Sequence, residues 1–283
     1  MTMPAPPARG LLAPEVRGGT SFKLIGLGGT GGIVARYLSI FLGSLGRAFR
    51  LVFVDGDNFE PGNSARMFYG SYGNKAVVTR ADLIERFADS ELSLLAIKEY
   101  VTAENVSRLI QNHDVVILCV DNHATRKLVA EHCAMLDDVC LVSGGNDGVG
   151  EDGSGVVRRG TYGNCQIYIR RGGKDLCPPL SQFHPEIREP GDHSPAEESC
   201  TEIIRSAPQL LFANLAVASM ILNAVLLYAS GELPYSEAAV DIAEGRMAPL
   251  SVPPPDLEAL RAADTQETGD VGLEKEPAAC HDD

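Results

Sequence analysis

The sequence predicts an α/β fold: a doubly wound, mainly parallel sheet with helices on both faces and an antiparallel extension toward the C-terminus. Three observations predict it. An apolar run from residue 22 ends in a glycine-rich turn and continues into a helical pattern. Apolar runs then alternate with helical spacings as far as residue 143, which is typical of parallel sheets. After Gly144 the apolar runs are short and separated by turn residues, which indicates antiparallel strands.

The expected elements follow in chain order. Strands are predicted at 22–26, 50–55, 92–101, 115–121 and 139–143, and helices at 33–43, 76–88, 104–111 and 124–135. Short antiparallel strands are predicted at 156–159 and 165–170. Residues 172–198 lack periodicity and form a connection of a length that is usually functional or disordered. A long apolar helix at 207–229 follows, which we expect to be buried against the sheet or in a dimer interface.

The chain divides into three predicted parts. Residues 1–20 are rich in Pro, Ala and Gly and form a flexible arm, residues 21–230 form one α/β domain, and residues 231–283 form an acidic, disordered tail. The formal net charge is −14, and residues 229–283 supply −10 of it through 13 acidic and three basic residues. The remainder is therefore near neutral and lacks the basic footprint of a nucleic-acid-binding protein.

The apolar runs and the cysteines indicate the cellular location that is expected for the protein. No apolar run reaches 18 residues and the N-terminus lacks a secretory pattern, so we expect neither a membrane partner nor export. The seven cysteines are odd in number and contain no CxxC pair. They predict reduced thiols of a cytoplasmic protein, without a disulfide framework or zinc.

The glycine-rich turn predicts a nucleotide site. Gly26, Gly28 and Gly31 satisfy G-x-G-x-x-G between a strand and a helix, and Gly29 lies in the same turn. This geometry points backbone N–H groups and a helix N-terminus at a phosphate. Asp55 ends the next strand, where an acid that binds ribose hydroxyls is expected. These features of a Rossmann-like fold alone also fit an NAD-dependent oxidoreductase.

Residues after the second strand fit a different chemistry. Asp57, Asn63 and Arg66 form a D-x5-N-x2-R pattern, and Lys75 follows. Two cations near a nucleotide suit the charge that develops on a leaving pyrophosphate, and hydride transfer would not need them. The alternative for either cation alone is a solvated surface charge.

Asp121 ends the predicted fourth strand. A carboxylate at the carboxyl end of a central parallel strand faces the ligand crevice, where it suits Mg²⁺ bound together with phosphates. The alternative is an N-cap for the helix that begins near residue 124.

Together these motifs resemble the ThiF/MoeB family of adenylating enzymes, which are related to the ubiquitin-activating enzymes. The resemblance rests on five ordered motifs and extends through Ser199-Cys200-Thr201 to about residue 228. The motifs are residues 26–31, 54–57, 63–66, 73–75 and 119–122. The variant glycine loop and the missing zinc cysteines further resemble the ThiF-type protein of bacterial PRTRC plasmid systems.

The resemblance implies ATP-dependent adenylation of the C-terminal glycine of a small ubiquitin-like or sulfur-carrier protein by a homodimer. It implies that Asp55 binds the ribose, that Asn63, Arg66 and Lys75 bind phosphates, and that Asp121 holds Mg²⁺. The family often uses an arginine from the partner subunit's N-terminal segment. The usual motif is absent here, and Arg9 or Arg17 would substitute.

Cys200 is the candidate acyl acceptor. Cys200-Thr201 resembles the thioester cysteine of ubiquitin-activating enzymes, and a thiolate there would take the acyl group from the adenylate. The alternative is an ordinary small residue at a loop–helix junction. Two other functions stay open, an NAD-dependent oxidoreductase and a non-catalytic nucleotide-binding adaptor, and ATP–pyrophosphate exchange separates adenylation from both.

Overall fold

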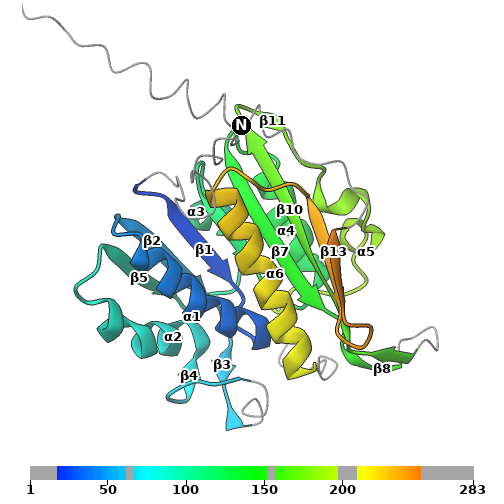
Figure 1. The fold of residues 1–283 in the computed structure, drawn as a ribbon, viewed down its shortest axis with the longest axis horizontal. Helices are drawn as coiled ribbons and strands as arrows, with labels where there is room; N and C mark the ends of the chain where they lie inside the picture. The colour runs from blue at the N-terminus through cyan, green and yellow to red at the C-terminus, as the bar shows by residue number, and fades with distance from the viewer. Residues whose placement is uncertain (1–17, 62–66, 152–156, 197–208, 250–283) are drawn as a thin grey trace, which may run out of the picture.

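The predicted fold class is confirmed by a computed structural model that describes residues 18–61, 67–151, 157–196 and 209–249. One large sheet runs through the molecule in the order β13-β12-β10-β7-β6-β1-β2-β5 (Figure 1). Neighbouring strands from β7 to β5 are parallel, and β10, β12 and β13 extend the sheet antiparallel to their neighbours. The parallel strands are β1 (Ser21–Ile25), β2 (Phe49–Val54), β5 (Leu92–Ile97), β6 (Val115–Leu118) and β7 (Val139–Asn146).

The antiparallel part and two small ribbons complete the strands. The extension consists of β10 (Tyr162–Arg171), β12 (Glu237–Asp241) and β13 (Arg246–Pro249), with β11 (Lys174–Asp175) paired to β10. The ribbons pair β3 (Asn58–Phe59) with β4 (Gly73–Asn74), and β8 (Val149–Glu151) with β9 (Val157–Arg159).

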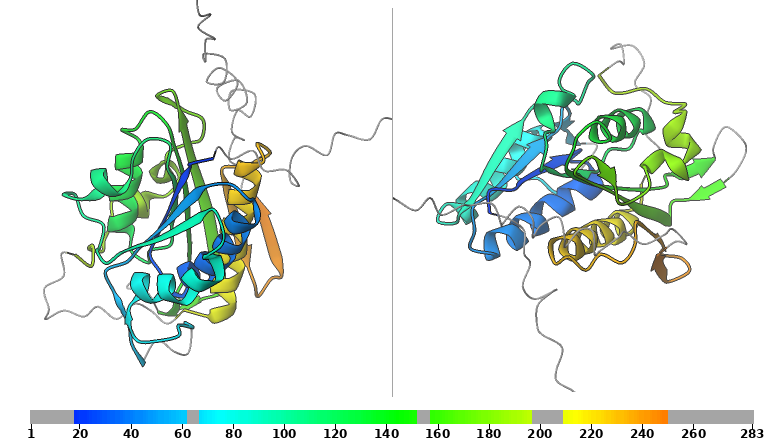
Figure 2. Two further views of the ribbon diagram at one scale, coloured as in Figure 1. Left: turned by 90° about the vertical axis from the view of Figure 1, so that its left-hand side faces the viewer. Right: turned by 90° about the horizontal axis from the view of Figure 1, so that it is seen from above.

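Helices cover both faces of the sheet (Figure 2). One face carries α1 (Gly29–Ser44), α2 (Lys75–Ile84), the short η2 (Glu85–Phe87) and α6 (Leu211–Ala229). The other carries α3 (Val106–Leu109), α4 (His123–Cys133), η3 (Leu180–Gln182) and α5 (Pro185–Arg188). The central strands are buried on both sides because their side chains alternate between two cores. In β6, Val115 and Ile117 join the α1 core, while Val116 and Leu118 join the α4 core.

Helix α6 is a core helix in this fold. By length and composition alone it could cross a membrane, since its 19 residues have a mean hydropathy of 1.9. Nine of its residues are buried, including Val217, Ile221 and Val225, and it packs against β7, β10 and α1. The helix is therefore buried against the sheet, which was the first of the two alternatives expected from the sequence. Leu211, Phe212 and Leu215 remain exposed near its first turn.

The structure differs from the sequence prediction after residue 230. Strands β12 and β13 lie inside the segment expected to be a disordered tail, so the sheet continues to Pro249. Ala238 and Val240 lie two positions apart in β12, so both face the same side of the sheet and are buried in the core under α6. The acidic composition around this short strand obscured it. The connection 172–198 also contains β11, η3 and α5, because Leu180 and Ile187 pack into the α4 core. The arm at 1–17 and the residues after 249 lie outside the described ranges.

Candidate functional site

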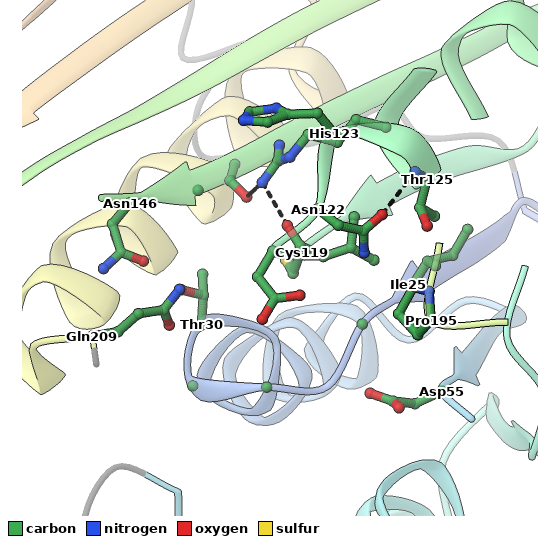
Figure 3. Close-up of a pocket in the computed structure, with 18 of the residues that line it drawn as sticks. Ile25, Thr30, Asp55, Cys119, Asn122, His123, Thr125, Asn146, Pro195 and Gln209 are labelled. Carbon is green, nitrogen blue, oxygen red and sulfur yellow. Dashed lines mark hydrogen bonds between the residues drawn. The ribbon is translucent and has the colours of Figure 1, made fainter. Parts of the chain in front are cut away.

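A large polar cavity lies at the carboxyl ends of the parallel strands. Its volume is about 1110 Å³, and its lining comes from the glycine turn, the ends of β2, β6 and β7, the start of α4, and β10 (Figure 3). Strand β1 lies between β2 and β6, so the chain winds in opposite directions on the two sides of it. Ligands of open α/β sheets bind in the crevice at such a switch point. The cavity is therefore the candidate active site.

The glycine turn has the backbone geometry of a phosphate-binding loop. Gly26 adopts φ +85°, a conformation that side chains rarely allow. A Cβ at Gly31 would lie 1.9 Å from the Gly26 carbonyl oxygen, so the helix start can approach the strand only with glycine here. The loop ends at Gly28, directly before the first turn of the 16-residue helix α1. Gly26, Gly28 and Gly29 line the cavity, as the sequence predicts for the nucleotide site.

Asp55 holds the loop against the next strand. Its Oδ2 accepts a hydrogen bond of 2.6 Å from the Leu27 backbone N–H, and its Oδ1 accepts one of 2.8 Å from the Asp57 N–H. Burial raises the pKa of Asp55, although the nearby Lys75 ammonium and the two backbone hydrogen bonds counteract it. The carboxylate also lines the cavity (Figure 3), where the sequence predicts a ribose ligand.

Lys75 reaches the cavity from the first residue of α2. Its Nζ lies 2.8 Å from Oδ2 of Asp57, and only 7% of the residue is exposed. Burial alone would raise the pKa of Asp57, but the charge and hydrogen bond of Lys75, with a hydrogen bond of 2.5 Å from the Tyr100 hydroxyl, lower it. Lys75 is therefore a buried, oriented cation, and the alternative of a solvated surface charge is wrong for it.

Asn74 fixes the position of Lys75, and the sequence analysis assigned it no role of its own. Its Oδ1 accepts from the Val77 N–H and so caps α2, while its Nδ2 donates to the backbone carbonyls of Asp55 and Asp57 at 2.8 and 2.9 Å. One side chain thus ties the start of α2 to the end of β2. An N-cap residue directly before a lysine was the available signal.

Asp121 lines the cavity and is not the N-cap of α4. Asn122 is the N-cap of α4, since its Oδ1 accepts from the Thr125 N–H at 2.8 Å (Figure 3). Asp192, from the connection before α6, accepts from the N–H groups of His123 and Ala124 at 2.8 and 2.9 Å. The backbone N–H groups at this helix start therefore have hydrogen-bond acceptors from Asn122 and Asp192. The capping alternative for Asp121 is wrong, and its exposed carboxylate lines the cavity.

Arg126 is a further site residue that sequence reasoning missed. Its guanidinium donates to the Val120 and Gly144 carbonyls and to the Ser143 hydroxyl at 2.6, 2.9 and 2.6 Å, which joins the ends of β6 and β7. Burial lowers its pKa, yet arginine stays protonated in proteins. An arginine inside a helical segment resembles an ordinary surface residue, so the sequence carried no distinguishing signal.

A charged cluster contributes His184 and Glu186 to the lining of the cavity. His184 Nδ1 lies 2.9 Å from Glu186 Oε1, and His184 Nε2 lies 2.9 Å from Glu237 Oε1. Glu237 belongs to β12 and is 96% buried, so the cluster fastens the connection before α6 to the sheet. Hydrogen bonding to Glu237 and Glu186 raises the pKa of His184, despite partial burial.

Stability is expected to decrease as pH rises because of this cluster. A raised histidine pKa stabilises the fold fully below the ordinary value of 6.5, and the contribution is lost as pH passes the higher folded-state pKa. We expect the unfolding free energy of the wild type to exceed that of His184→Gln by more at pH 6 than at pH 9. Urea unfolding at both values measures this difference. An equal difference at the two pH values would contradict the assignment, and His113→Gln, an exchange at a histidine outside the cluster, is the control.

Several of the predicted site residues belong to segments outside the described ranges. Asn63, Arg66 and Cys200, together with Arg9 and Arg17, lie outside the described ranges. The thiols that are described are free and carry pKa values raised by burial, to about 12 for Cys119 and Cys177. Neither of these two is an activated nucleophile. Within the described ranges, no group of three or more His, Cys, Asp or Glu side chains is arranged to hold a metal ion.

Comparison with known proteins adds family membership and fold. The ThiF family pattern matches residues 19–263. The adenylyltransferase and sulfurtransferase MOCS3 of Dictyostelium discoideum is 34% identical over 129 residues, which cover 44% of this chain and 28% of that protein. Protein HesA of Leptolyngbya boryana is 28% identical over 111 residues, which cover 38% of each. The matched segments therefore span well under half the length of either relative.

Solved structures share the architecture. The E. coli MccB structure with MccA-N7isoASN has a TM-score of 0.59 at 16% identity, over 86% of this chain and 67% of that one. MccB with ATP has a TM-score of 0.57 at 16% identity, over 87% of this chain and 67% of that one. At this identity the likeness shows a common fold.

Proposed function

The chain belongs to the ThiF family, and we propose on this ground that it uses ATP to adenylate the C-terminal carboxylate of a peptide or small carrier protein. The observation that carries the proposal is the cavity itself. A glycine turn, a buried lysine and an exposed aspartate converge there, each from the end of a different central strand or the helix after it. This set suits a nucleotide whose phosphates react, and the Dictyostelium relative is described as an adenylyltransferase.

The proposed reaction places the substrate carboxylate in line with the bond that breaks. A carboxylate oxygen forms a bond to the α-phosphorus, the bond from that phosphorus to the bridging oxygen of the β-phosphate breaks, and pyrophosphate leaves with the electron pair. The protein positions the reactants and stabilises charge. Asp55 would bind the ribose, the turn from Gly26 to Gly31 would bind phosphates through backbone N–H groups, and Lys75 would neutralise the leaving pyrophosphate, with Asn63 and Arg66 assisting as the resemblance implies.

Asp121 is the residue that would hold Mg²⁺. The chemistry of the donor fits, because Mg²⁺ is usually bound by one or two carboxylates together with substrate phosphates, and Asp121 is an exposed carboxylate relieved of capping by Asn122. When bound, the ion would neutralise phosphate charge. Arg126 would keep Asp121 in place, since it binds the carbonyl of the preceding residue.

The finer assignments follow from the relatives and the resemblance. A small ubiquitin-like or sulfur-carrier protein ending in glycine is the proposed partner, supported by the sulfurtransferase name of the Dictyostelium relative and by MccB structures that contain MccA. Transfer to Cys200 as a thioester, membership of the PRTRC branch and a cytoplasmic location stay predictions.

ATP–pyrophosphate exchange tests the function. We expect the purified chain to catalyse exchange of labelled pyrophosphate into ATP when a carrier ending in glycine and Mg²⁺ are present. Calorimetry should detect ATP binding and no comparable NAD binding. Tight NAD binding without ATP binding would favour an oxidoreductase, and ATP binding without exchange across candidate carriers would favour a non-catalytic adaptor.

A homodimer is expected to form through the exposed start of α6. Leu211, Phe212 and Leu215 are 40, 72 and 41% exposed on one helix, and removing such a cluster from water favours association. Light scattering should give about twice the chain mass of 30.2 kDa at micromolar concentration. The double exchange Phe212→Glu with Leu215→Glu should restore the monomer. Phe183→Glu, at an exposed aromatic residue outside α6, is the control. A monomeric wild type contradicts the prediction.

A further inference from the structure

Part of the cavity is lined by polar residues of β10 and α4 and of the connection before α6, and we call this part the side pocket. Asn164 and Gln166 of β10 line it, because they alternate with Cys165 and Ile167, which face the α1 core. Arg126 of α4 and His184 also line the cavity. The whole cavity, at about 1110 Å³, exceeds the usual volume of a site for one small ligand, which is about 300–1,000 Å³. It therefore has room for a second group beside a nucleotide.

The side pocket contains a buried amide without a partner. Gln166 is 96% buried, and within the described ranges its Nε2 makes no hydrogen bond. Neighbouring oxygens already have donors, since Ser143 Oγ accepts from Arg126 and Glu237 Oε1 accepts from His184 and Asn164. Buried polar groups in proteins are almost always hydrogen-bonded. A group that enters the cavity would supply a partner for Gln166.

The charges of the pocket define which group would fit. Arg126 is a buried cation and His184 has a raised pKa, which disfavours a cationic ligand. Glu237 and Glu186 flank His184, and Asp192 lies at the start of α4, which disfavours a carboxylate. An apolar group would leave the amide of Gln166 unpaired. A neutral group with a carbonyl acceptor and an N–H donor satisfies the pocket.

From this arrangement we infer that the side pocket selects a carboxamide side chain, asparagine or glutamine, within the last two residues of the substrate. The inference rests on the proposed adenylation, which places the substrate's C-terminal carboxylate near Asp121. The residues that precede the carboxylate then extend toward β10. Gln166 is thus a specificity-determining residue, and Asn164 and His184 form the wall around the bound amide.

Peptide binding tests the inference independently of catalysis. Short N-acetylated peptides that end in Asn, Gln, Leu, Asp or Lys serve as probes, and a second series adds a glycine after the test residue. Calorimetry is performed on the full chain with a non-hydrolysable ATP analogue. We expect the Asn or Gln peptides of one series to bind about tenfold or more tightly than the Leu peptide. Gln166→Met should remove that difference, while Gln182→Met, an exposed glutamine exchanged in the same way, should retain it.

The outcomes separate the side pocket from the proposed reaction. Gln166→Met removes the unpaired Nε2 donor and keeps the length of the side chain, so its melting temperature should be close to that of the wild type. Gln166→Glu provides a second variant that lacks the donor. Equal binding of amide and leucine peptides, including no binding of either, overturns the side pocket. So does an amide preference that survives Gln166→Met. An amide preference without pyrophosphate release from any peptide supports the side pocket and overturns adenylation of such substrates.

Discussion

Asp121→Asn is expected to lower the adenylation rate by more than a hundredfold and to leave the melting temperature unchanged. The carboxylate would bind Mg²⁺, whose loss removes several kcal/mol of charge stabilisation, on the order of 3 kcal/mol or more. The amide keeps the shape of the side chain, and the cap of α4 is supplied by Asn122 and Asp192 instead. Pyrophosphate exchange across a range of Mg²⁺ concentrations measures the effect. If Asp121→Asn catalyses pyrophosphate exchange at the wild-type rate, then Asp121 has no role in the reaction.

Asn122→Ala is the matched variant for stability. It removes the hydrogen bond to the Thr125 N–H, and loss of an N-cap typically costs about 1 kcal/mol. The two variants should therefore differ: Asp121→Asn should lower the activity and keep the stability, whereas Asn122→Ala should lower the stability. If Asp121→Asn lowers the unfolding free energy as much as Asn122→Ala does, then Asp121 has a structural role that the hydrogen bonds do not reveal.

Lys75→Met should produce the second large loss, about a hundredfold or more in exchange rate. Lys75 is a buried cation oriented by Asp57 and by the start of α2, and removing one preorganised donor of this kind typically costs roughly 3 kcal/mol of transition-state stabilisation. The stability cost should be small, because the Asp57 side chain is 48% exposed and can be hydrated when its partner is removed. Lys127→Met is the control, since Lys127 lies on α4 and pairs with Glu131 one helical turn away.

A change in the Michaelis constant alone would alter this interpretation. Loss of a group that acts on the leaving pyrophosphate lowers the maximal rate, whereas loss of uniform binding raises the constant for ATP without changing that rate. We expect the maximal rate to fall. If only the constant for ATP rises, Lys75 binds the nucleotide without acting on the reaction.

The parts of the site that the sequence predicted are those defined by local rules. Gly26 and Gly31 are required by backbone geometry within a few residues, and Asp55 and Asp121 follow buried strands whose carboxyl ends meet at one edge of the sheet. Lys75 was predicted from its spacing after the glycine turn. For the glycines and the two aspartates, a short stretch of sequence contains the physical cause.

The parts that the sequence did not predict depend on contacts between distant segments. Arg126 acquires its role from the ends of two strands, and His184 meets Glu237 across 53 positions. No local pattern distinguishes these residues from solvated ones. Strands β12 and β13 were hidden for another reason: they are short, and acidic residues around them dominate the composition. Their strand character comes from pairing with β10, which supplies hydrogen bonds and a buried surface.

The late position of β12 in the chain has a consequence for protein synthesis. One part of the cavity, which we call the nucleotide half, consists of the glycine turn, Asp55, Lys75 and Asp121. These residues all lie within the first 121 positions, so they are synthesised early. Glu237 emerges more than a hundred residues later. Apart from the two residues that pair with β11, the outer edge of β10 stays unpaired until β12 has been made. Because distant strand pairings form slowly, a nascent chain would expose an open sheet edge during this interval. Shortened chains that stop before residue 237 should therefore keep the strands of the nucleotide half and tend to aggregate through β10.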